Sequence, residues 1–389
     1  MRIADQALLA AGVVLPVVVA FSNALAEIAS AVLILAVIAR VALGRPRWPS
    51  GRAFAGLLGV WLIACLLSVA FAADPAHAFR AFSRKTLEYA TVALGMSFVG
   101  REARQLQLVL KTLAWAGVVF SIDGLLQWRL GHDLLRWHAP WASRLTGPMD
   151  NPNNFATYLV MVMPIQLWAI FAMTKRWQAV LLSLGIVSAI PPLILTDSRL
   201  AWLLFSFGVL AFLGLTKRMV LLGYLVLLGL GVVRFQQPAS LPELFELSPG
   251  RVEGWTIAWR MFLDHPFVGI GLGSYMDHYM SYLTSHAGTW PRPQYAHNCY
   301  LQLLAEGGVI GLGAFLLSVG WVLAKVWRQL RSSSEGVRSP LHGLIVSLLV
   351  FFVSMAFDTG LYSLPIALLF WSLLGLAAGA AQAVRPRPA

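Results

Sequence analysis

One long polar interval, from Ser248 to Gly311, interrupts a sequence that otherwise consists of one apolar run after another. It carries arginines at positions 251 and 260, and it runs into an apolar segment through His297 and Asn298. A guanidinium group binds phosphate in a bidentate manner, and a neutral imidazole can take a proton from a hydroxyl group. These residues therefore predict a site where a phosphate-bearing substrate is held and a hydroxyl group is activated.

The composition indicates an integral membrane protein. Of the 389 residues, 58% are apolar and 12% are charged, whereas charged residues make up about 25% of an ordinary soluble domain. The formal net charge of +12 could suggest nucleic acid, but the lysines and arginines lie in short loops and do not form the clustered surface that nucleic-acid binding requires. We therefore expect membrane lipids, and no nucleic acid, among the partners.

Twelve apolar segments are long enough to cross roughly 30 Å of hydrocarbon as helices. They lie near residues 7–22, 24–43, 53–72, 86–100, 105–127, 153–174, 177–195, 199–215, 219–235, 298–324, 341–357 and 362–383. Lysines and arginines mark every second connection, so the positive-inside rule places both termini in the cytoplasm. The first segment imitates a cleavable signal ending at Ala26, but a second apolar run follows at once, and we expect the first helix to be retained.

The sequence thus predicts an all-α, polytopic membrane protein of about twelve transmembrane helices, with a helical loop domain between the ninth and the tenth. Residues 1–235 would form helices one to nine, residues 236–296 the loop domain on the outer side, and residues 297–389 the last three helices. A loop of that length is usually functional.

The loop domain itself should contain a helix. Ser248 and Pro249 are typical of a helix start, and the helix should end before Pro266. An apolar stripe suited to the membrane surface would be formed by Trp255, Ala258, Trp259 and Phe262. Arg251 would lie on the same face, directed toward the membrane-embedded body.

A set of basic residues departs from the positive-inside rule because its members lie on the outer side. They are Arg80, Arg84, Lys85, Arg144, Arg199, Arg251, Arg260 and Arg292. Any one of them alone could pair with a lipid phosphate or a nearby acid. Several of them, however, lie on separate loops at the same face of the membrane, and a diphosphate needs more than one such partner. Arg84, Lys85 and Arg199 rank highest because they stand at helix entrances, where a charge is costly and usually functional.

His297 is the candidate general base, with Asn298 beside it and Glu306 further along the same predicted helix. Neighbouring arginines would keep its imidazole neutral. The alternative is an interfacial histidine hydrogen-bonded to a loop. For Glu306, a structural role as the partner of an outer arginine and a functional role remain equally open.

Neither a metal nor another cofactor is expected. His265, Asp277, His278 and His286 are too loosely spaced for a metal site, and the outer side has no Asp-x-Asp pair for a metal-bound sugar nucleotide. The glycines of GIGLGSY, residues 269–275, resemble a nucleotide-binding turn only superficially, since no strand precedes them and no crossover helix follows. We interpret this segment as a close-packing turn.

Several stretches of the chain, taken in order, resemble one known family. They are RLTGPMDNPNNFATYL, TDSR at the start of a helix, GRVEGWTIAW, DHPFVGIGLGSY and HNCYLQLLAEGGVIG. Together they resemble the O-antigen ligase and polymerase superfamily of bacterial envelopes over roughly residues 140–320. The spacing from His297 and Asn298 to Gly308 and Gly311 is similar to that of the lipopolysaccharide ligase branch.

The resemblance implies a glycosyltransferase that moves O-antigen polysaccharide from undecaprenyl diphosphate to lipid A-core at the periplasmic face of the bacterial inner membrane, without metal or ATP. It implies that Arg199 and Arg251 hold the donor diphosphate and that His297 activates the acceptor hydroxyl. Further candidates for the diphosphate are Arg84, Lys85 and Arg80, and candidates for supporting roles are Asn298, Glu306, Arg144 and Arg260. Displacement in one step would invert the anomeric centre.

Other functions remain open at this point. An O-antigen polymerase or a protein O-oligosaccharyltransferase of the same superfamily would use similar residues, although the protein-glycosylating members tend to be longer than this chain. A polyprenyl-glycan or small-anion transporter is the alternative from another class. A transporter would place ionisable groups near the bilayer midplane and show repeated halves, whereas the charges here gather at one face.

Overall fold

The computed structural model describes residues 2–43, 52–214, 249–283 and 295–383. These residues form helices and irregular connections, and their only β-type pairing within the described ranges is an isolated bridge between Trp141 and Arg144. Seven described helices are long and apolar enough to span a membrane, and three shorter apolar helices accompany them. The predicted all-α, polytopic membrane architecture is confirmed.

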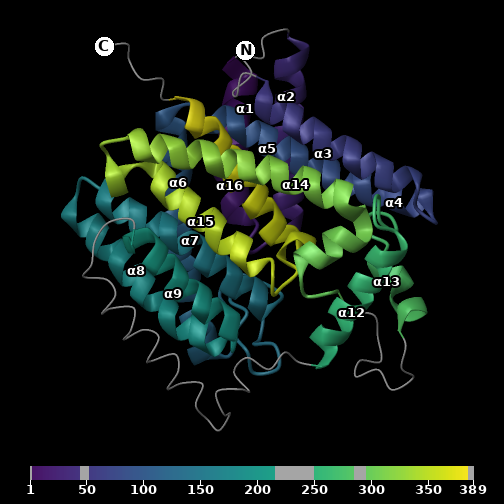
Figure 1. Cartoon of the computed structure of the whole chain (residues 1–389). Helices are drawn as coiled ribbons and strands as arrows, with labels where there is room; N and C mark the ends of the chain where they lie inside the picture. Colours follow the sequence, from purple (N-terminus) through teal and green to yellow (C-terminus); the bar gives the residue numbers. More distant parts are fainter. Residues whose placement is uncertain (1, 44–51, 215–248, 284–294, 384–389) are drawn as a thin grey trace.

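Eleven long helices form a bundle (Figure 1). They are α1 (Arg2–Val18), α2 (Asn23–Ala42), α3 (Ala53–Ala70), α5 (Leu87–Gly100), α6 (Ala103–Leu130), α7 (Pro152–Ala172), α8 (Arg176–Leu195), α9 (Arg199–Gly214), α14 (Cys299–Ser332), α15 (Pro340–Ser354) and α16 (Leu364–Ala383). Each coincides with one predicted span. The span predicted at 219–235 lies outside the described residues, so the total of twelve stays a prediction.

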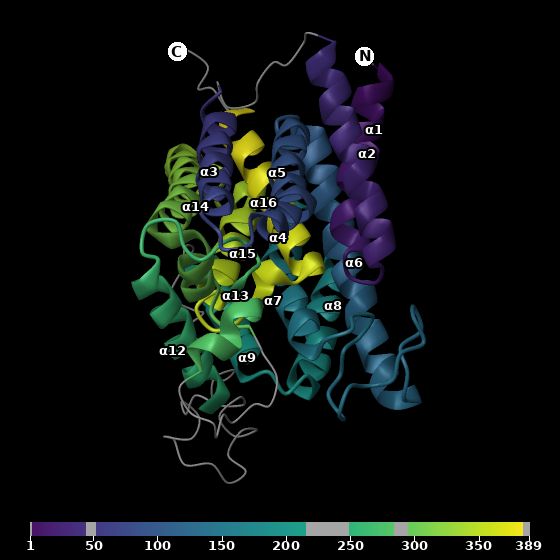
Figure 2. The ribbon, with the colours of Figure 1, turned by 90° about the vertical axis from the view of Figure 1, so that its right-hand side faces the viewer.

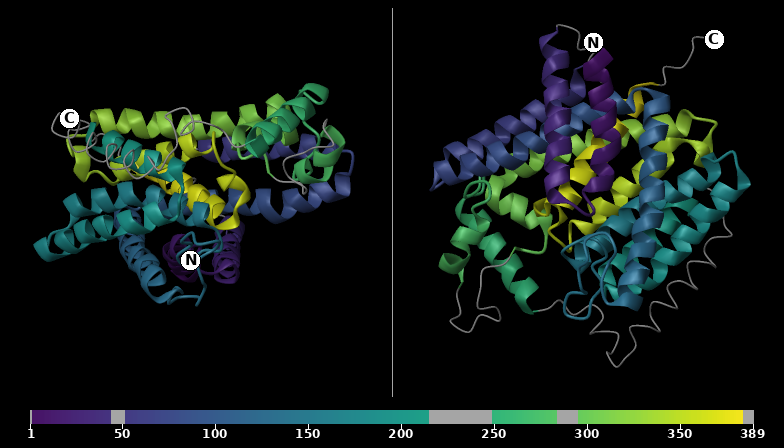
Figure 3. Two further views of the ribbon diagram at one scale, coloured as in Figure 1. Left: turned by 90° about the horizontal axis from the view of Figure 1, so that it is seen from below. Right: turned by 180° about the vertical axis from the view of Figure 1, so that it is seen from behind.

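The bundle has two distinct ends. The start of α1 and the end of α16 lie at one end, and the shorter helices α12 (Pro249–Asp264) and α13 (Tyr275–His278) lie at the other (Figure 2). Seen from below, α14 runs along one edge and α1 lies at the opposite edge (Figure 3). Both described terminal helices therefore have their chain ends opposite the loop domain, as the topology predicts. Which end faces the cytoplasm stays a prediction.

Helix α16 is the central element of the core. Gly375 and Gly379 bring it so close to α5 that an added Cβ would overlap the backbone carbonyls of Ala93 and Ser97. Such small residues let membrane helices approach closely, where packing replaces the hydrophobic effect as the source of stability. The buried Trp371 stacks on Trp61 of α3, with ring centroids 4.7 Å apart. This rigid core supports the connections that lie at the α12 end.

Two outer segments differ from the sequence prediction. After α3 the chain forms α4 (Pro75–Ala81), because Asp74 caps it by accepting a hydrogen bond from the His77 N–H at 2.9 Å. It continues through a π-helical turn (Phe82–Thr86) into α5, so the helical path begins well before the predicted residue 86. A π-turn is rare and often marks a functional region.

Helix α12 begins at Pro249 and ends at Asp264, which confirms the predicted helix, although Ser248 lies outside the described residues. Its packing face is formed by Gly254, Ile257, Ala258 and Met261, which are buried. The predicted stripe shares Ala258 with this packing face, whereas Trp259 is 47% exposed. The contact of the stripe with the membrane surface stays a prediction.

Candidate active site

His297 lies in the short connection that leads into α14, at the α12 end of the bundle. Its φ of 49° is in the left-handed region, which a residue other than glycine adopts only when its surroundings hold it there. The Asn298 side chain caps α14 by accepting a hydrogen bond from the Leu301 N–H at 3.1 Å. The buried Ala296 N–H donates to Gln302 Oε1 at 3.2 Å. The backbone on both sides of His297 is therefore fixed.

Asp358, between α15 and α16, is the acidic neighbour of His297. His297 Nδ1 lies 3.5 Å from Asp358 Oδ1, and this nitrogen is buried without a hydrogen bond in the described chain. The Thr359 N–H donates to Oδ1 at 2.8 Å, and the Cys299 thiol donates to the Asp358 carbonyl at 3.1 Å. The carboxylate is thus anchored facing Nδ1, and Nε2 remains for a reactant. The sequence analysis did not identify Asp358.

Arg144 joins the loop between α6 and α7 to the turn before α9. Its Nε donates to the Thr196 carbonyl at 2.7 Å, and one Nη donates to Asn153 Oδ1 at 2.8 Å. Thr196 opens the TDSR motif, whose last residue, Arg199, begins α9. The exposed Arg199 side chain therefore starts from a turn that Arg144 holds in place.

Charged side chains from other segments act on the pKa of Arg144. Burial lowers the pKa of Arg144, the carboxylates of Asp197 and Asp358 oppose this effect, and the positive charge of Arg251 adds to it. Asp358 faces His297 and also acts electrostatically on Arg144. We call three residues the cationic cluster: Arg144, Arg251, whose charge acts on it, and Arg199, which follows the turn that Arg144 binds.

Arg80, Arg84 and Lys85, which the sequence also assigns to the diphosphate, are exposed on α4 and the π-turn. No contact in the described chain joins them to His297, and their role stays a prediction. Arg260 donates to the Tyr282 carbonyl at 3.3 Å, which ties α12 to the 3-10 turn Tyr279–Tyr282. Arg292 is outside the described residues. Arg260 and the capping residue Asn298 therefore act as structural supports of the loop domain and of α14.

Helix α14 is broken where the glycine-rich turn meets it. Gly308 has a φ of 61° and a ψ of −169°, which interrupts the helix. The freed backbone groups bond to the turn: the Ile270 N–H donates to the Ala305 carbonyl at 2.9 Å, and the Val309 N–H donates to the Pro266 carbonyl at 2.9 Å. Irregular backbone inside a membrane protein requires such internal partners. GIGLGSY is confirmed as a close-packing turn.

Glu306 holds this turn to α14. Its carboxylate accepts hydrogen bonds from the Gly273 and Tyr275 N–H groups at 3.1 and 3.4 Å, from Gln302 Nε2 at 3.3 Å and from the Tyr362 hydroxyl at 3.2 Å. Gln302 is also the partner of the residue before His297. The buried Glu306 is therefore structural, and the predicted pairing with an outer arginine is wrong in the described chain, because four neutral donors occupy the carboxylate.

We expect Glu306→Gln to destabilise the protein, because an amide NH₂ must then face groups that are themselves donors. Each unsatisfied buried donor costs about 1–3 kcal/mol. The measurement is thermal unfolding in detergent, with Glu335→Gln, an exposed glutamate in the connection between α14 and α15, as the matched control. Equal melting temperatures for the two variants would contradict the structural role.

The residues considered as metal ligands are dispersed. Asp277 Oδ2 pairs with His77 Nε2 at 3.3 Å, His278 Nδ1 lies 3.0 Å from the Ser274 carbonyl, and His286 is outside the described residues. No group of three His, Cys, Asp or Glu side chains that could hold a metal ion occurs among the residues searched, which are those described.

The fold and this geometry define a polytopic helical membrane protein in which a histidine and a carboxylate stand beside several guanidinium groups. Residues 191–316 match the family model described as O-Antigen ligase, and this match supports membership of the O-antigen ligase superfamily. The matched segment includes Arg199, Arg251 and His297, whereas Arg144 and Asp358 lie outside it. No curated protein matches the chain.

Proposed function

We propose that this protein is an O-antigen ligase, which transfers O-antigen polysaccharide from undecaprenyl diphosphate to a hydroxyl group of lipid A-core at the periplasmic face of the inner membrane. The observation that carries the proposal is the His297–Asp358 pair beside the cationic cluster. Membership of the superfamily supports a lipid-linked polysaccharide as the substrate class.

The cationic cluster would bind the diphosphate of the donor. Guanidinium groups match phosphate oxygens with two parallel hydrogen bonds and keep their charge when partly buried. When the glycosidic bond to phosphate breaks, negative charge develops on the leaving diphosphate, and pre-positioned cations stabilise that charge most in a partly desolvated site. Arg144, held by Thr196 and Asn153, would act as a fixed member of this set, with Arg199 and Arg251 completing it.

His297 would act as the general base. With Nδ1 directed to the Asp358 carboxylate, Nε2 takes the proton of the acceptor hydroxyl while its oxygen forms a bond to the anomeric carbon of the donor sugar. The bond from that carbon to the phosphate oxygen breaks, and its electron pair leaves with the diphosphate. Asp358 stabilises the imidazolium, which then releases the proton to solvent. One displacement of this kind inverts the anomeric centre.

The test is transfer by purified protein in detergent or liposomes. Polyprenyl-diphosphate O-antigen is incubated with lipid A-core, with a second polyprenyl-linked glycan or with an acceptor protein, in the presence of a chelator and without ATP. We expect product on lipid A-core, visible as slower migration in electrophoresis, with inverted linkage by NMR. Product on the glycan or on the protein alone would instead identify a polymerase or a protein glycosyltransferase. Lack of any product would overturn the proposal.

Asp358→Asn should lower kcat about 10²- to 10³-fold with little change in the KM for donor, because the amide cannot stabilise the imidazolium or direct the base. Steady-state kinetics on the same transfer reaction measure both constants. Asp264→Asn, at the exposed end of α12, is the control and should leave both constants near the wild-type values. A wild-type kcat for Asp358→Asn would remove Asp358 from the mechanism.

A further inference from the structure

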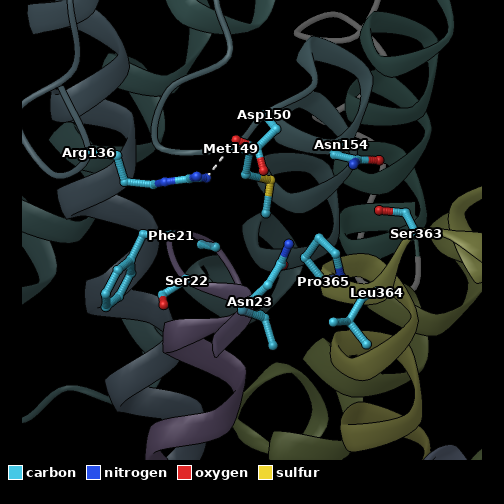
Figure 4. Close-up of a pocket in the computed structure, with 12 residues that line it drawn as sticks. Phe21, Ser22, Asn23, Arg136, Met149, Asp150, Asn154, Ser363, Leu364 and Pro365 are labelled. Atoms are coloured by element: carbon cyan, nitrogen blue, oxygen red, sulfur yellow. Dashed lines mark ion pairs between the residues drawn. The ribbon is translucent and has the colours of Figure 1, made fainter. Parts of the chain in front are cut away.

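A cavity of about 180 Å³ is lined by residues close in sequence to Asn153 and Asp358 (Figure 4). It is bounded by the α1–α2 connection, by the end of the loop between α6 and α7, and by the first residues of α16. Its lining residues include Phe21, Asn23, Arg136, Asp150, Asn154 and Ser363. The cavity therefore draws on three parts of the chain that are far apart in sequence.

The polar groups in the cavity are available for a ligand. Within the described chain, the side-chain amides of Asn23 and Asn154 make no hydrogen bond, and Figure 4 shows the Asn23 amide directed into the space between Met149 and Pro365. Each amide offers two N–H donors and a carbonyl acceptor. Since sugar hydroxyl groups both donate and accept, two amides that lack protein partners are suited to them. Phe21 also lines the cavity, while its ring packs on Phe120, with ring centroids 6.1 Å apart.

The charges in the cavity are balanced. Arg136 and Asp150 form an ion pair of 2.9 Å, and His138 Nδ1 lies 3.6 Å from the same carboxylate oxygen. The guanidinium is thus neutralised, in contrast to the cationic cluster, so the cavity favours an uncharged ligand over a second phosphate. Its volume is below the roughly 300–1,000 Å³ of pockets that hold drug-sized ligands, which limits the ligand to about one ring.

Two short links connect the cavity to the active site. Asn154 lines the cavity, while the preceding Asn153 binds the Arg144 guanidinium. On the other side, the cavity is lined by Ser363, in the connection between α15 and α16 that carries Asp358, and by Leu364, the first residue of α16. The cavity is therefore formed in part by the two segments that hold Arg144 and Asp358.

We propose that this cavity is a subsite for one uncharged sugar ring of a substrate, held by Asn23 and Asn154, with Phe21 in its lining. The proposal rests on the proposed function, since it assigns the cavity to a glycan of the same reaction. The ring belongs either to the acceptor core or to the donor glycan, and both offer the same hydroxyl chemistry.

The kinetic test uses the full-length protein with the double variant Asn23→Ala, Asn154→Ala and the single variant Asp150→Asn. The double variant should raise one KM about tenfold, as expected for the loss of two ordinary hydrogen bonds, and leave kcat within about twofold. A raised KM for lipid A-core assigns the ring to the acceptor, and a raised KM for the donor assigns it to the donor. The matched control for Asp150→Asn is Asp277→Asn. Both carboxylates lie close to a histidine, and their side chains are similarly exposed, 56% for Asp277 and 59% for Asp150.

A binding test separates this proposal from the proposed function. Delipidated core oligosaccharide and delipidated O-antigen glycan are added separately, and hydrogen exchange is followed at residues 19–23 and 149–154. Protection by one of them that is lost in the double variant supports the subsite, even if the protein shows no transfer. Wild-type transfer with unchanged KM values in the double variant, or no protection by either glycan, overturns the subsite and leaves the proposed function standing. If the double variant does not fold, a variant that combines Asp150→Asn with Phe21→Leu replaces it in the same measurements.

Discussion

Replacement of His297 by alanine should lower the rate of glycan transfer to lipid A-core about 10²- to 10⁴-fold, the usual contribution of a positioned general base. The acceptor hydroxyl would then have to lose its proton to water while it attacks. The expected loss is in kcat, because donor binding depends on the cationic cluster and not on the imidazole. The measurement is the initial rate with purified protein at saturating donor.

His297→Asn is the sharper variant. Asparagine tolerates the left-handed backbone that His297 adopts with its φ of 49°, so this change removes the base without disturbing the start of α14. His278→Ala serves as the control, because His278 is also partly buried at the α12 end, and its Nδ1 lies 3.0 Å from the carbonyl of Ser274, the residue that precedes its own short helix. Wild-type rates for folded His297→Asn would show that another group takes the proton.

Gly308→Ala should reduce both the amount of folded protein and its activity to a small fraction of wild type. The φ of 61° at this position is unfavourable for alanine by about 1–2 kcal/mol. An added Cβ would also overlap the Phe267 carbonyl and the Val268 nitrogen. Because these atoms belong to the inserted turn, the turn must leave α14, and its backbone partners become unsatisfied. Fluorescence-detected gel filtration and thermal unfolding measure the loss.

Gly311 provides a matched control one turn further along the same helix. A Cβ added at Gly311 meets nothing within 4 Å, and alanine is favoured over glycine in a helix by about 1 kcal/mol. Gly311→Ala should therefore fold as well as the wild type or better. Similar stability of the Gly308 and Gly311 variants would contradict the account of the broken helix.

Much of this architecture was predictable because it depends on local pattern. Runs of apolar residues marked the helices, and Pro249 and Pro266 marked the ends of α12. His297 and Arg251 were identified because charged and polar groups are conspicuous in an apolar chain. The structure places His297 against Asp358, and the charge of Arg251 acts on Arg144. The glycine spacing of GIGLGSY was correctly interpreted because no nucleotide-binding context surrounded it.

The features that the sequence did not reveal depend on contacts between residues that are far apart in the chain. Asp358 is a single acid in the connection between α15 and α16, and only the packing of α15 against the start of α14 places it beside His297. The same holds for Glu306, whose partners Gly273 and Tyr362 come from two distant connections. The packing face of α12, formed by Gly254, Ile257, Ala258 and Met261, was not identified, because large aromatic residues dominate the apolar pattern of this helix.

The break at Gly308 divides α14 into two straight parts, here called rods, which are held by different neighbours. An unbroken helix of 34 residues would measure about 51 Å, far more than the roughly 30 Å of hydrocarbon. The longer rod, residues 309–332, is about 36 Å long and can adjust its tilt to the thickness of the surrounding lipid. The shorter rod, with the imidazole at its tip, is fastened to the loop domain and follows that domain instead. A change in the tilt of the longer rod therefore need not move His297.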